Sequence, residues 1–401
     1  MIDLGSDISI RAGQAARQRS NIAPGLLPIR AASLKDSSHL VDTSGSVSFA
    51  PGQVTLGELS GAGDSANYEG HIWVHTEVSN LSGTYRPRFL SPVYAPESTR
   101  TRDGLQTWKF PAASAQTGLE LITGTGGAAT LGTFQAYQMD DILSRPAYVI
   151  VAGGQSLMEC SHNAYGIDPA HDFWPGPRCL CVPGYSYAGF GTTRGALHAM
   201  HAPLLFKSQS SGVSPAIAFA QELMPFVPES HNLVIVCAAY SATTLVGSDG
   251  DWNPAGSGQN VDAYQNAVDL IADTMAALPA GSEIKAWLWA QGQGDLSPTM
   301  DVAYPAAFAA MRNAMESDTG SGQVPWMLFG PPPDATSIHT DLFVETFANM
   351  DQDSGHATAQ PMAHTVAHPP GYMEDAAHVT AWGSRVMGKL VARRFIEEGY
   401  L

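Results

Sequence analysis

Two patterns of hydrophobic and polar residues divide the chain. In residues 41–145, short runs alternate apolar with polar positions, and Gly, Pro, Ser and Asn stand between them; this pattern is typical of antiparallel strands. From residue 147 on, continuous apolar runs alternate with segments of helical period, which is typical of a parallel sheet covered by helices. The change near Pro146 predicts an N-terminal arm over residues 1–40, a β-rich, sandwich-like accessory domain over 41–145 and an α/β domain over 146–401.

The second pattern predicts five strands of one parallel sheet. They cover residues 147–152, 233–238, 284–290, 325–329 and 363–367. The predicted helices cover residues 213–224, 262–278, 302–316, 338–350 and 380–398. A long stretch at 160–212, rich in aromatic residues, Gly and Pro, follows the first strand, and a loop of this length usually forms a lid or a binding wall.

Composition and charge exclude several classes of protein. Hydrophobic residues make up 44% of the chain and charged residues 14%, which is typical of a globular protein. The net charge of −17 argues against nucleic acid or an anionic membrane surface as a partner. The chain contains no apolar run long enough to insert into a membrane. The first seven residues lack the features of a signal peptide, which leads us to expect a protein that is cytoplasmic or carried in a virion or surface assembly.

The cysteines are expected to be thiols, because no export signal was found. Cys179 and Cys181 are too closely spaced for a zinc knuckle, and Cys237 lies in an apolar strand. A disulfide between Cys160 and Cys179 or Cys181 stays open as an alternative.

The first predicted strand ends in Gly153-Gly154-Gln155-Ser156. In open α/β sheets, sites form at the carboxyl ends of the strands. A serine at the start of the next helix can point its hydroxyl into such a crevice, and its backbone N–H points toward incoming negative charge. The alternative is that Ser156 only caps the helix.

A second informative stretch, with Asp375 and His378, precedes the last predicted helix. A histidine there could take the proton of Ser156 while the carboxylate orients the imidazole. The alternative is that Asp375 only caps the helix and that His378 is incidental.

A third stretch follows the strand at 284–290 and reads Gln291-Gly292-Gln293-Gly294-Asp295. The amide of Gln291 could donate to a developing oxyanion, although Gly and Asp are also common in plain turns.

Together these stretches resemble the SGNH hydrolases. The motifs are Gly-Gln-Ser ending at Ser156, Trp-x-Gln-Gly-x-x-Asp from Trp289 to Asp295, and Asp-x-x-His from Asp375 to His378. Within that superfamily, they are similar to sialate O-acetylesterase-like and acetylxylan-esterase-like carbohydrate esterases. The resemblance covers about residues 147–398. It implies a flavodoxin-like, three-layer α/β/α fold with a five-stranded parallel sheet.

The resemblance also implies roles for single residues. Ser156 would be the nucleophile, His378 the general base and Asp375 its partner. The oxyanion hole would contain the backbone N–H groups of Ser156 and Ser241 and the amide of Gln291. The side chains expected to bind substrate are those of Gln155, Thr243 and Trp174. Two departures put substrate preference and rate in doubt: the family's Gly-Gly-Thr reads Ser241-Ala242-Thr243, and its Gln-Gly-Glu reads Gln291-Gly292-Gln293.

The sequence therefore predicts a serine esterase that removes O-acetyl or other short acyl groups from a carbohydrate. No cofactor is expected, and no metal site, because His198 and His201 lack an accompanying carboxylate or cysteine ligand. The expected partner is an acetylated glycan. The alternative is a virion or surface spike that binds glycans through a weakly active or inactive domain. The arm and the β-rich domain leave a homo-oligomer or a larger assembly open.

Overall fold

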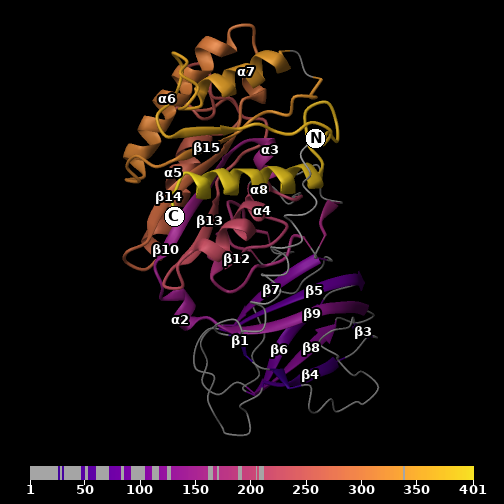
Figure 1. The fold of residues 1–401 in the computed structure, drawn as a ribbon. Helices are drawn as coiled ribbons and strands as arrows, with labels where there is room; N and C mark the ends of the chain where they lie inside the picture. The colour runs from indigo at the N-terminus through magenta and orange to yellow at the C-terminus, as the bar shows by residue number, and fades with distance from the viewer. Residues whose placement is uncertain are drawn as a thin grey trace.

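The computed structural model (Figure 1) describes the backbone of the strands between residues 26 and 138, the side chain of Trp73, and most of residues 139–401. Within that last range, the described residues exclude 161–165, 169–170, 188–191, 205, 207–211 and 337–338.

The described residues between 26 and 138 form nine strands, which pair antiparallel in two sheets. One sheet has the order β1-β9-β5-β7, with β3 also paired to β9, and the other has the order β2-β4-β8-β6. Their bounds are Leu26–Leu27 (β1), Ile29–Arg30 (β2), Val47–Phe49 (β3), Gln53–Leu59 (β4), Ile72–Ser82 (β5), Tyr85–Ser91 (β6), Gly104–Phe110 (β7), Thr117–Thr123 (β8) and Ala128–Gln138 (β9). The first two strands fall in the range predicted as an arm. Packing of the two sheets into a sandwich, and the three domain boundaries, stay predictions.

The α/β part is built on a seven-stranded sheet of order β12-β11-β13-β10-β14-β15-β16. The strands are Ala147–Gly154 (β10), Cys179–Val182 (β11), His198–Ala199 (β12), Asn232–Cys237 (β13), Glu283–Ala290 (β14), Trp326–Phe329 (β15) and Ala363–Val366 (β16). All neighbours pair in parallel except β11 and β12, which are antiparallel. The sheet is thus mostly parallel, as predicted.

The prediction of five strands was wrong in number. The five predicted segments correspond to β10, β13, β14, β15 and β16. The two further strands come from the stretch that was predicted to be only a loop. The run Cys179-Leu180-Cys181-Val182 is short but fully buried, and it extends the sheet beside β13.

Figure 1 shows the helices of this part of the chain. They are Asp140–Leu143 (α2), Ser156–Glu159 (α3), Pro215–Leu223 (α4), Ala263–Ala277 (α5), Met300–Asp318 (α6), Thr340–Met350 (α7) and Ala381–Glu397 (α8). The strand order reverses at β10, because β11, β12 and β13 lie on one side of it and the later strands β14, β15 and β16 lie on the other. With right-handed crossovers, this reversal puts α4 on one face and α5, α6 and α7 on the other. In agreement, α4 packs against α8, while α6 packs against both α5 and α7.

Large aromatic side chains fill the core between the sheet and its helices. Trp287, Trp289 and Trp326 are fully buried, and the rings of Trp287 and Trp326 stack with centroids 4.6 Å apart. Phe308 of α6 meets the ring of Trp326 edge-on at 5.4 Å. This packing stabilises the central strands, whose carboxyl ends lie at one edge of the sheet. Within the described part of the chain, no helix has both the length and the apolar composition needed to cross a bilayer.

Candidate active site

Ser156 lies where β10 turns into α3. The strand Ala147–Gly154 is buried along nearly its whole length, and β10 is the point at which the strand order reverses, which is where ligands bind in open α/β sheets. Gly154 has φ +115°, and a Cβ there would collide with the carbonyl oxygen of Ala290. Only glycine fits this turn. No side chain caps the start of α3.

The structure brings Ser156, His378 and Asp375 together. Oγ of Ser156 lies 3.1 Å from Nε2 of His378. On the other side of the imidazole, Nδ1 lies 2.8 Å from Oδ2 of Asp375. Distances of this size place each pair within hydrogen-bond reach. The imidazole can therefore accept the serine proton on one nitrogen while the carboxylate accepts a hydrogen bond from the other.

Asp375 is held in its ionised form. Partial burial alone would raise its pKa, but hydrogen bonds from the backbone N–H of Ala377, from the side chain of His378 and from the backbone N–H of His378 lower the pKa to about 2. Both N–H groups donate to Oδ1 at 2.8 Å. The loop that carries His378 thus keeps its partner charged near neutral pH.

Gln293 connects the loop that carries Ser156 with the loop that carries His378. Its Oε1 accepts a hydrogen bond from Nε2 of Gln155 at 2.8 Å and lies 3.4 Å from Oγ of Ser156. Its Nε2 donates to the carbonyl oxygen of Ala377 at 2.5 Å. The sequence marked Gln293 only as a departure from the family motif. Its position next to Gln291, at the carboxyl end of a strand, was the signal that could have identified it.

Gln291 does not reach the site, contrary to the sequence prediction. The side chain is 1% exposed, and its Nε2 donates to Oδ2 of Asp295 at 2.6 Å and to the carbonyl oxygen of Thr243 at 3.2 Å. Its Oε1 accepts from the hydroxyl of Tyr304 at 2.7 Å. Because an amide nitrogen has two hydrogens, no donor is left for an oxyanion.

The backbone N–H of Ser241, predicted as a second oxyanion donor, donates instead to Oε2 of Glu159 at 3.0 Å. The Ser241 hydroxyl also donates to this oxygen. Glu159 was missed by the sequence reasoning, although it is 1% exposed and stands one helical turn after Ser156. The signal in the sequence was the position of Glu159, an acidic residue inside an otherwise apolar run, which indicates a carboxylate with a buried partner. The role of the Ser156 N–H as an oxyanion donor stays a prediction.

The next residue, Ala242, has φ +58°. Ala242 stands where the family motif Gly-Gly-Thr, named in the sequence analysis, has its second glycine. An L-residue with a Cβ is strained in the left-handed region, at a cost of about 1–2 kcal/mol. The loop keeps this conformation because Glu159 fixes Ser241 on one side, and the side chain of Thr243 donates to the carbonyl oxygen of Tyr240 at 2.7 Å on the other.

The three side chains predicted to bind substrate are buried and already bonded. Gln155 is 3% exposed, and its Oε1 accepts from the backbone N–H groups of Gly292 and Gly294. Thr243 is fully buried and accepts from the indole N–H of Trp252 at 3.0 Å. Trp174 is 6% exposed, and its indole N–H donates to the carbonyl oxygen of Cys179. The prediction was wrong for all three, because these side chains hold loops in place.

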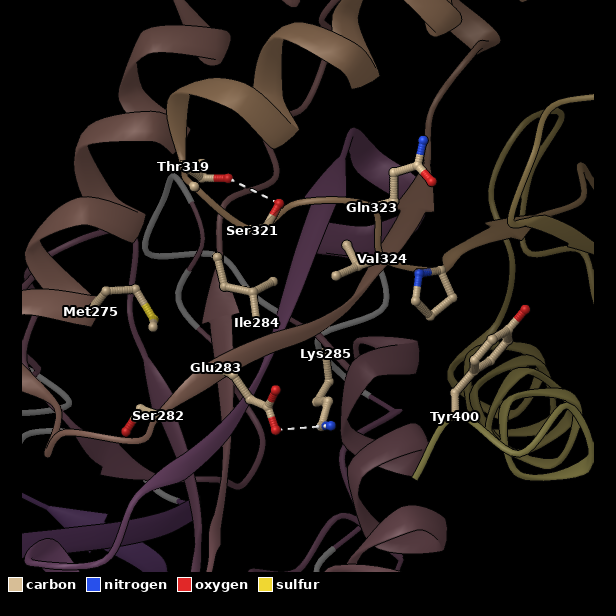
Figure 2. A pocket seen from close by; sticks show the side chains of 12 residues that line it. Met275, Ser282, Glu283, Ile284, Lys285, Thr319, Ser321, Gln323, Val324 and Tyr400 are labelled. Atoms are coloured by element: carbon tan, nitrogen blue, oxygen red, sulfur yellow. Dashed lines mark hydrogen bonds and ion pairs between the residues drawn. The ribbon is translucent and has the colours of Figure 1, made fainter.

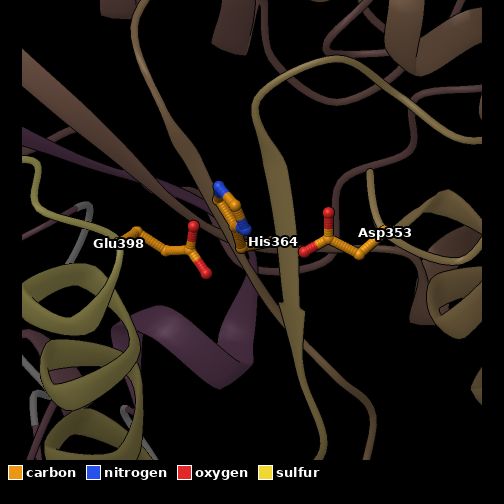
Figure 3. Close-up of side chains that lie close together, drawn as sticks. All are labelled: Asp353, His364 and Glu398. Carbon is orange, nitrogen blue, oxygen red and sulfur yellow. The ribbon is translucent and has the colours of Figure 1, made fainter.

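Two other features lie away from this site. A pocket of about 430 Å³ (Figure 2) includes Glu283 and Lys285 at the start of β14, so it lies at the amino edge of the sheet. The carboxylates of Asp353 and Glu398 flank the ring of His364 (Figure 3), and such a group could hold a metal ion. However, Nη2 of Arg394 lies 2.9 Å from an oxygen of each carboxylate. This arginine already supplies the positive charge between them.

All four cysteines are buried thiols, as expected. Burial raises the pKa of the Cys179 and Cys237 thiols well above the usual value, which makes them poor nucleophiles.

A family model described as "carbohydrate esterase, sialic acid-specific acetylesterase" matches residues 148–397. This range holds the whole parallel sheet except the first residue of β10, together with Ser156, Asp375 and His378. The chain belongs to this family of carbohydrate esterases. The resemblance inferred from the sequence motifs is thereby confirmed, and the family supports an esterase that deacetylates carbohydrates.

Solved structures with a similar chain course share little sequence with this protein. A protein of Arabidopsis thaliana has a TM-score of 0.48 and 18% identity, over 63% of this chain and 98% of its own. NanS has a TM-score of 0.45 and 17% identity, over 64% of this chain and 99% of its own. A carbohydrate acetylesterase from Xanthomonas citri has a TM-score of 0.43 and 17% identity, over 82% of this chain and 71% of its own. No curated protein matches the chain significantly.

Proposed function

We propose that the protein removes O-acetyl groups from a carbohydrate by a Ser-His-Asp mechanism. The observation that carries this proposal is the arrangement around His378, with Oγ of Ser156 at 3.1 Å from one ring nitrogen and Oδ2 of Asp375 at 2.8 Å from the other. The family match supports an acetylated carbohydrate as substrate.

In the first half of the reaction, Oγ of Ser156 attacks the acetyl carbonyl carbon, and Nε2 of His378 takes the hydroxyl proton. Asp375 stabilises the imidazolium that forms. The oxyanion develops near the start of α3, where the backbone N–H of Ser156 can donate to it. When the intermediate collapses, the C–O bond to the sugar breaks. His378 returns its proton to the sugar oxygen, and the acetyl group stays on Ser156.

In the second half, water replaces the sugar. His378 takes a proton from water, the resulting hydroxide equivalent attacks the acetyl carbonyl, and the bond to Oγ of Ser156 breaks. The proton on His378 then returns to Oγ. The products are acetate and the free enzyme. Gln293 keeps the Ser156 and His378 loops in register through both halves, because it bonds to Gln155 and to the Ala377 carbonyl.

The test is acetate release from an acetylated oligosaccharide by the wild-type protein and by Ser156→Ala. The variant should lose at least about 10⁴-fold in kcat, as when a catalytic nucleophile is removed. Ser144→Ala is a matched control. Ser144 is an exposed serine that precedes β10, at the end of the strand opposite to Ser156, and its hydroxyl donates locally to the carbonyl oxygen of Asp141. Equal activity in wild type and Ser156→Ala would refute the proposed nucleophile. The family match gives no support to the alternative of an inactive spike protein.

A further inference from the structure

Glu159 is a buried carboxylate close to Ser156 that has no part in the proton transfers of the proposed reaction. It is the last residue of α3, one helical turn after Ser156, and its side chain is 1% exposed. Burying a carboxylate costs free energy unless hydrogen bonds satisfy it. The partners of Glu159 therefore indicate why the fold keeps it there.

Glu159 bonds to the loop that follows β13. Its Oε2 accepts a hydrogen bond from the backbone N–H of Ser241 at 3.0 Å and another from the Ser241 hydroxyl. Hydrogen bonds to a carboxylate are among the stronger ones in proteins. Because β13 pairs with β10 in the sheet, this contact connects the helix that carries Ser156 with the strand beside it.

The β13 loop, residues 240–243, lies between the turn before the nucleophile and the stretch that follows β14. On one side, the backbone N–H of Tyr240 donates to the carbonyl oxygen of Gly154 at 2.9 Å. On the other side, a Cβ added to Gly294 would lie 2.4 Å from the carbonyl oxygen of Thr243. A displacement of the β13 loop would therefore be transmitted to both of its neighbours.

Two strained residues flank the contact between Glu159 and Ser241. Cys160, directly after Glu159, has φ +50°, and Ala242, directly after Ser241, has φ +58°. Residues with a Cβ keep such a backbone only when the surrounding contacts over-determine it, and this kind of strain is concentrated at functional sites. The helix α3 is a single turn, which is not stable by itself. The contact thus holds two segments that would otherwise relax.

We propose that Glu159 is a positioning residue, which fixes Ser156 in its attacking position by bonding α3 to the β13 loop through Ser241. This inference rests on the proposed function and gives it a residue outside the Ser-His-Asp set. Gln293 holds the nucleophile loop on the side of β14, and Glu159 holds it on the side of β13. Without Glu159, Oγ of Ser156 moves away from the imidazole, which lowers the rate of attack rather than the affinity for the ester.

The experiment measures kcat and KM for p-nitrophenyl acetate in Glu159→Ala, in Glu159→Gln, in Ser241→Ala and in the double alanine variant. In Glu159→Ala, kcat should fall about 10- to 100-fold, as for the loss of one or two hydrogen bonds to a charged group, with KM within about twofold. Glu159→Gln keeps an acceptor oxygen in nearly the same place, so its kcat should stay within about fivefold of wild type. Because both residues act through one contact, the double variant should lose less than the product of the two single losses.

Glu316→Ala is the matched control for removing a buried carboxylate. Glu316 is 8% exposed and accepts a hydrogen bond from the indole N–H of Trp326 at 3.1 Å. Because Trp326 is the first residue of β15, this carboxylate lies at the amino end of that strand. The control should unfold at lower urea concentration but keep kcat within about twofold, with near-UV circular dichroism to check the fold. A purely structural role would give Glu159→Ala the same result.

The proposal would be overturned by a kcat within about twofold of wild type in folded Glu159→Ala, by a loss confined to KM, or by fully multiplicative losses in the double variant. If Glu159→Ala does not fold, Ser241→Ala decides. This variant removes only a hydroxyl and should lower kcat at least about threefold, whereas an unchanged kcat would contradict the proposed role.

A wild-type kcat in Ser156→Ala would mean that the proposed function fails separately. The contact itself is then tested by amide hydrogen exchange, in which the Ser241 N–H should exchange at least about tenfold faster in Glu159→Ala than in wild type. Faster exchange supports the connection between α3 and the β13 loop, and an unchanged exchange rate overturns it.

Discussion

Gln293→Met is the substitution that best tests how the site is held together. Methionine has nearly the length of glutamine but cannot make its hydrogen bonds. The change removes the acceptor for Gln155 at 2.8 Å and the donor to the Ala377 carbonyl at 2.5 Å. It also removes the oxygen that lies 3.4 Å from Oγ of Ser156. The nucleophile loop and the histidine loop then lose their direct connection.

The expected loss follows from these contacts. Two partly buried hydrogen bonds are worth about 1 kcal/mol each in net terms. If both are needed to hold the reacting geometry, about 2 kcal/mol is lost from transition-state stabilisation, which corresponds to roughly 30-fold in kcat. We expect the loss in kcat rather than KM, because Gln293 orders the reacting groups and does not bind the sugar.

The assay is hydrolysis of p-nitrophenyl acetate under saturating conditions, with near-UV circular dichroism to check the fold. Gln323→Met is the matched control, because Gln323 is exposed and lies at the amino edge of the sheet. The control should keep wild-type kcat. A Gln293→Met enzyme with kcat within twofold of wild type would show that the connection does not position the site.

Three further predictions concern stability and ionisation. Arg385→Met leaves a buried carboxylate unpaired and should lower the free energy of unfolding in urea by about 3–5 kcal/mol. Arg393→Met, at an exposed pair on the same helix, should lower it by about 0–1 kcal/mol. Equal losses in the two variants would contradict the role of the buried pair. Ala242→Gly should raise the free energy of unfolding by about 1 kcal/mol by relieving φ +58°, and a lower melting temperature would speak against it. Asp375, whose pKa is about 2, should contribute stability above pH 4 or so that is lost as pH falls toward 2. By carboxyl NMR its titration should move to higher pH in His378→Ala, and an unchanged midpoint would exclude the imidazole as a cause.

The sequence was most informative where burial decides structure. The runs that became β10, β13 and β14 are continuous and apolar, so they could only be central strands. Ser156 was chosen by the rule that sites form at the carboxyl ends of parallel strands, whereas His378 was chosen because its stretch precedes the last predicted helix and resembles the family motif.

The sequence did not predict which of two side chains of the same kind is buried and which is exposed to the site or to solvent. Gln291 and Gln293 are both amides after the same strand, and the buried carboxylate of Asp295 decides which of them is turned inward. Similarly, the sequence alone does not distinguish Trp174 from Trp382. One packs into the core and the other is exposed, a difference that depends on tertiary packing and leaves no local pattern.

The most direct test of the central claim is to identify the residue that carries the acetyl group during turnover. The protein would be mixed with p-nitrophenyl acetate, quenched in acid during the initial burst, digested and mapped by mass spectrometry. Our account predicts one acetylated peptide, modified at Ser156, that is absent in His378→Ala. Acetyl transfer to another residue, or equal labelling of Ser156 with and without His378, would contradict it.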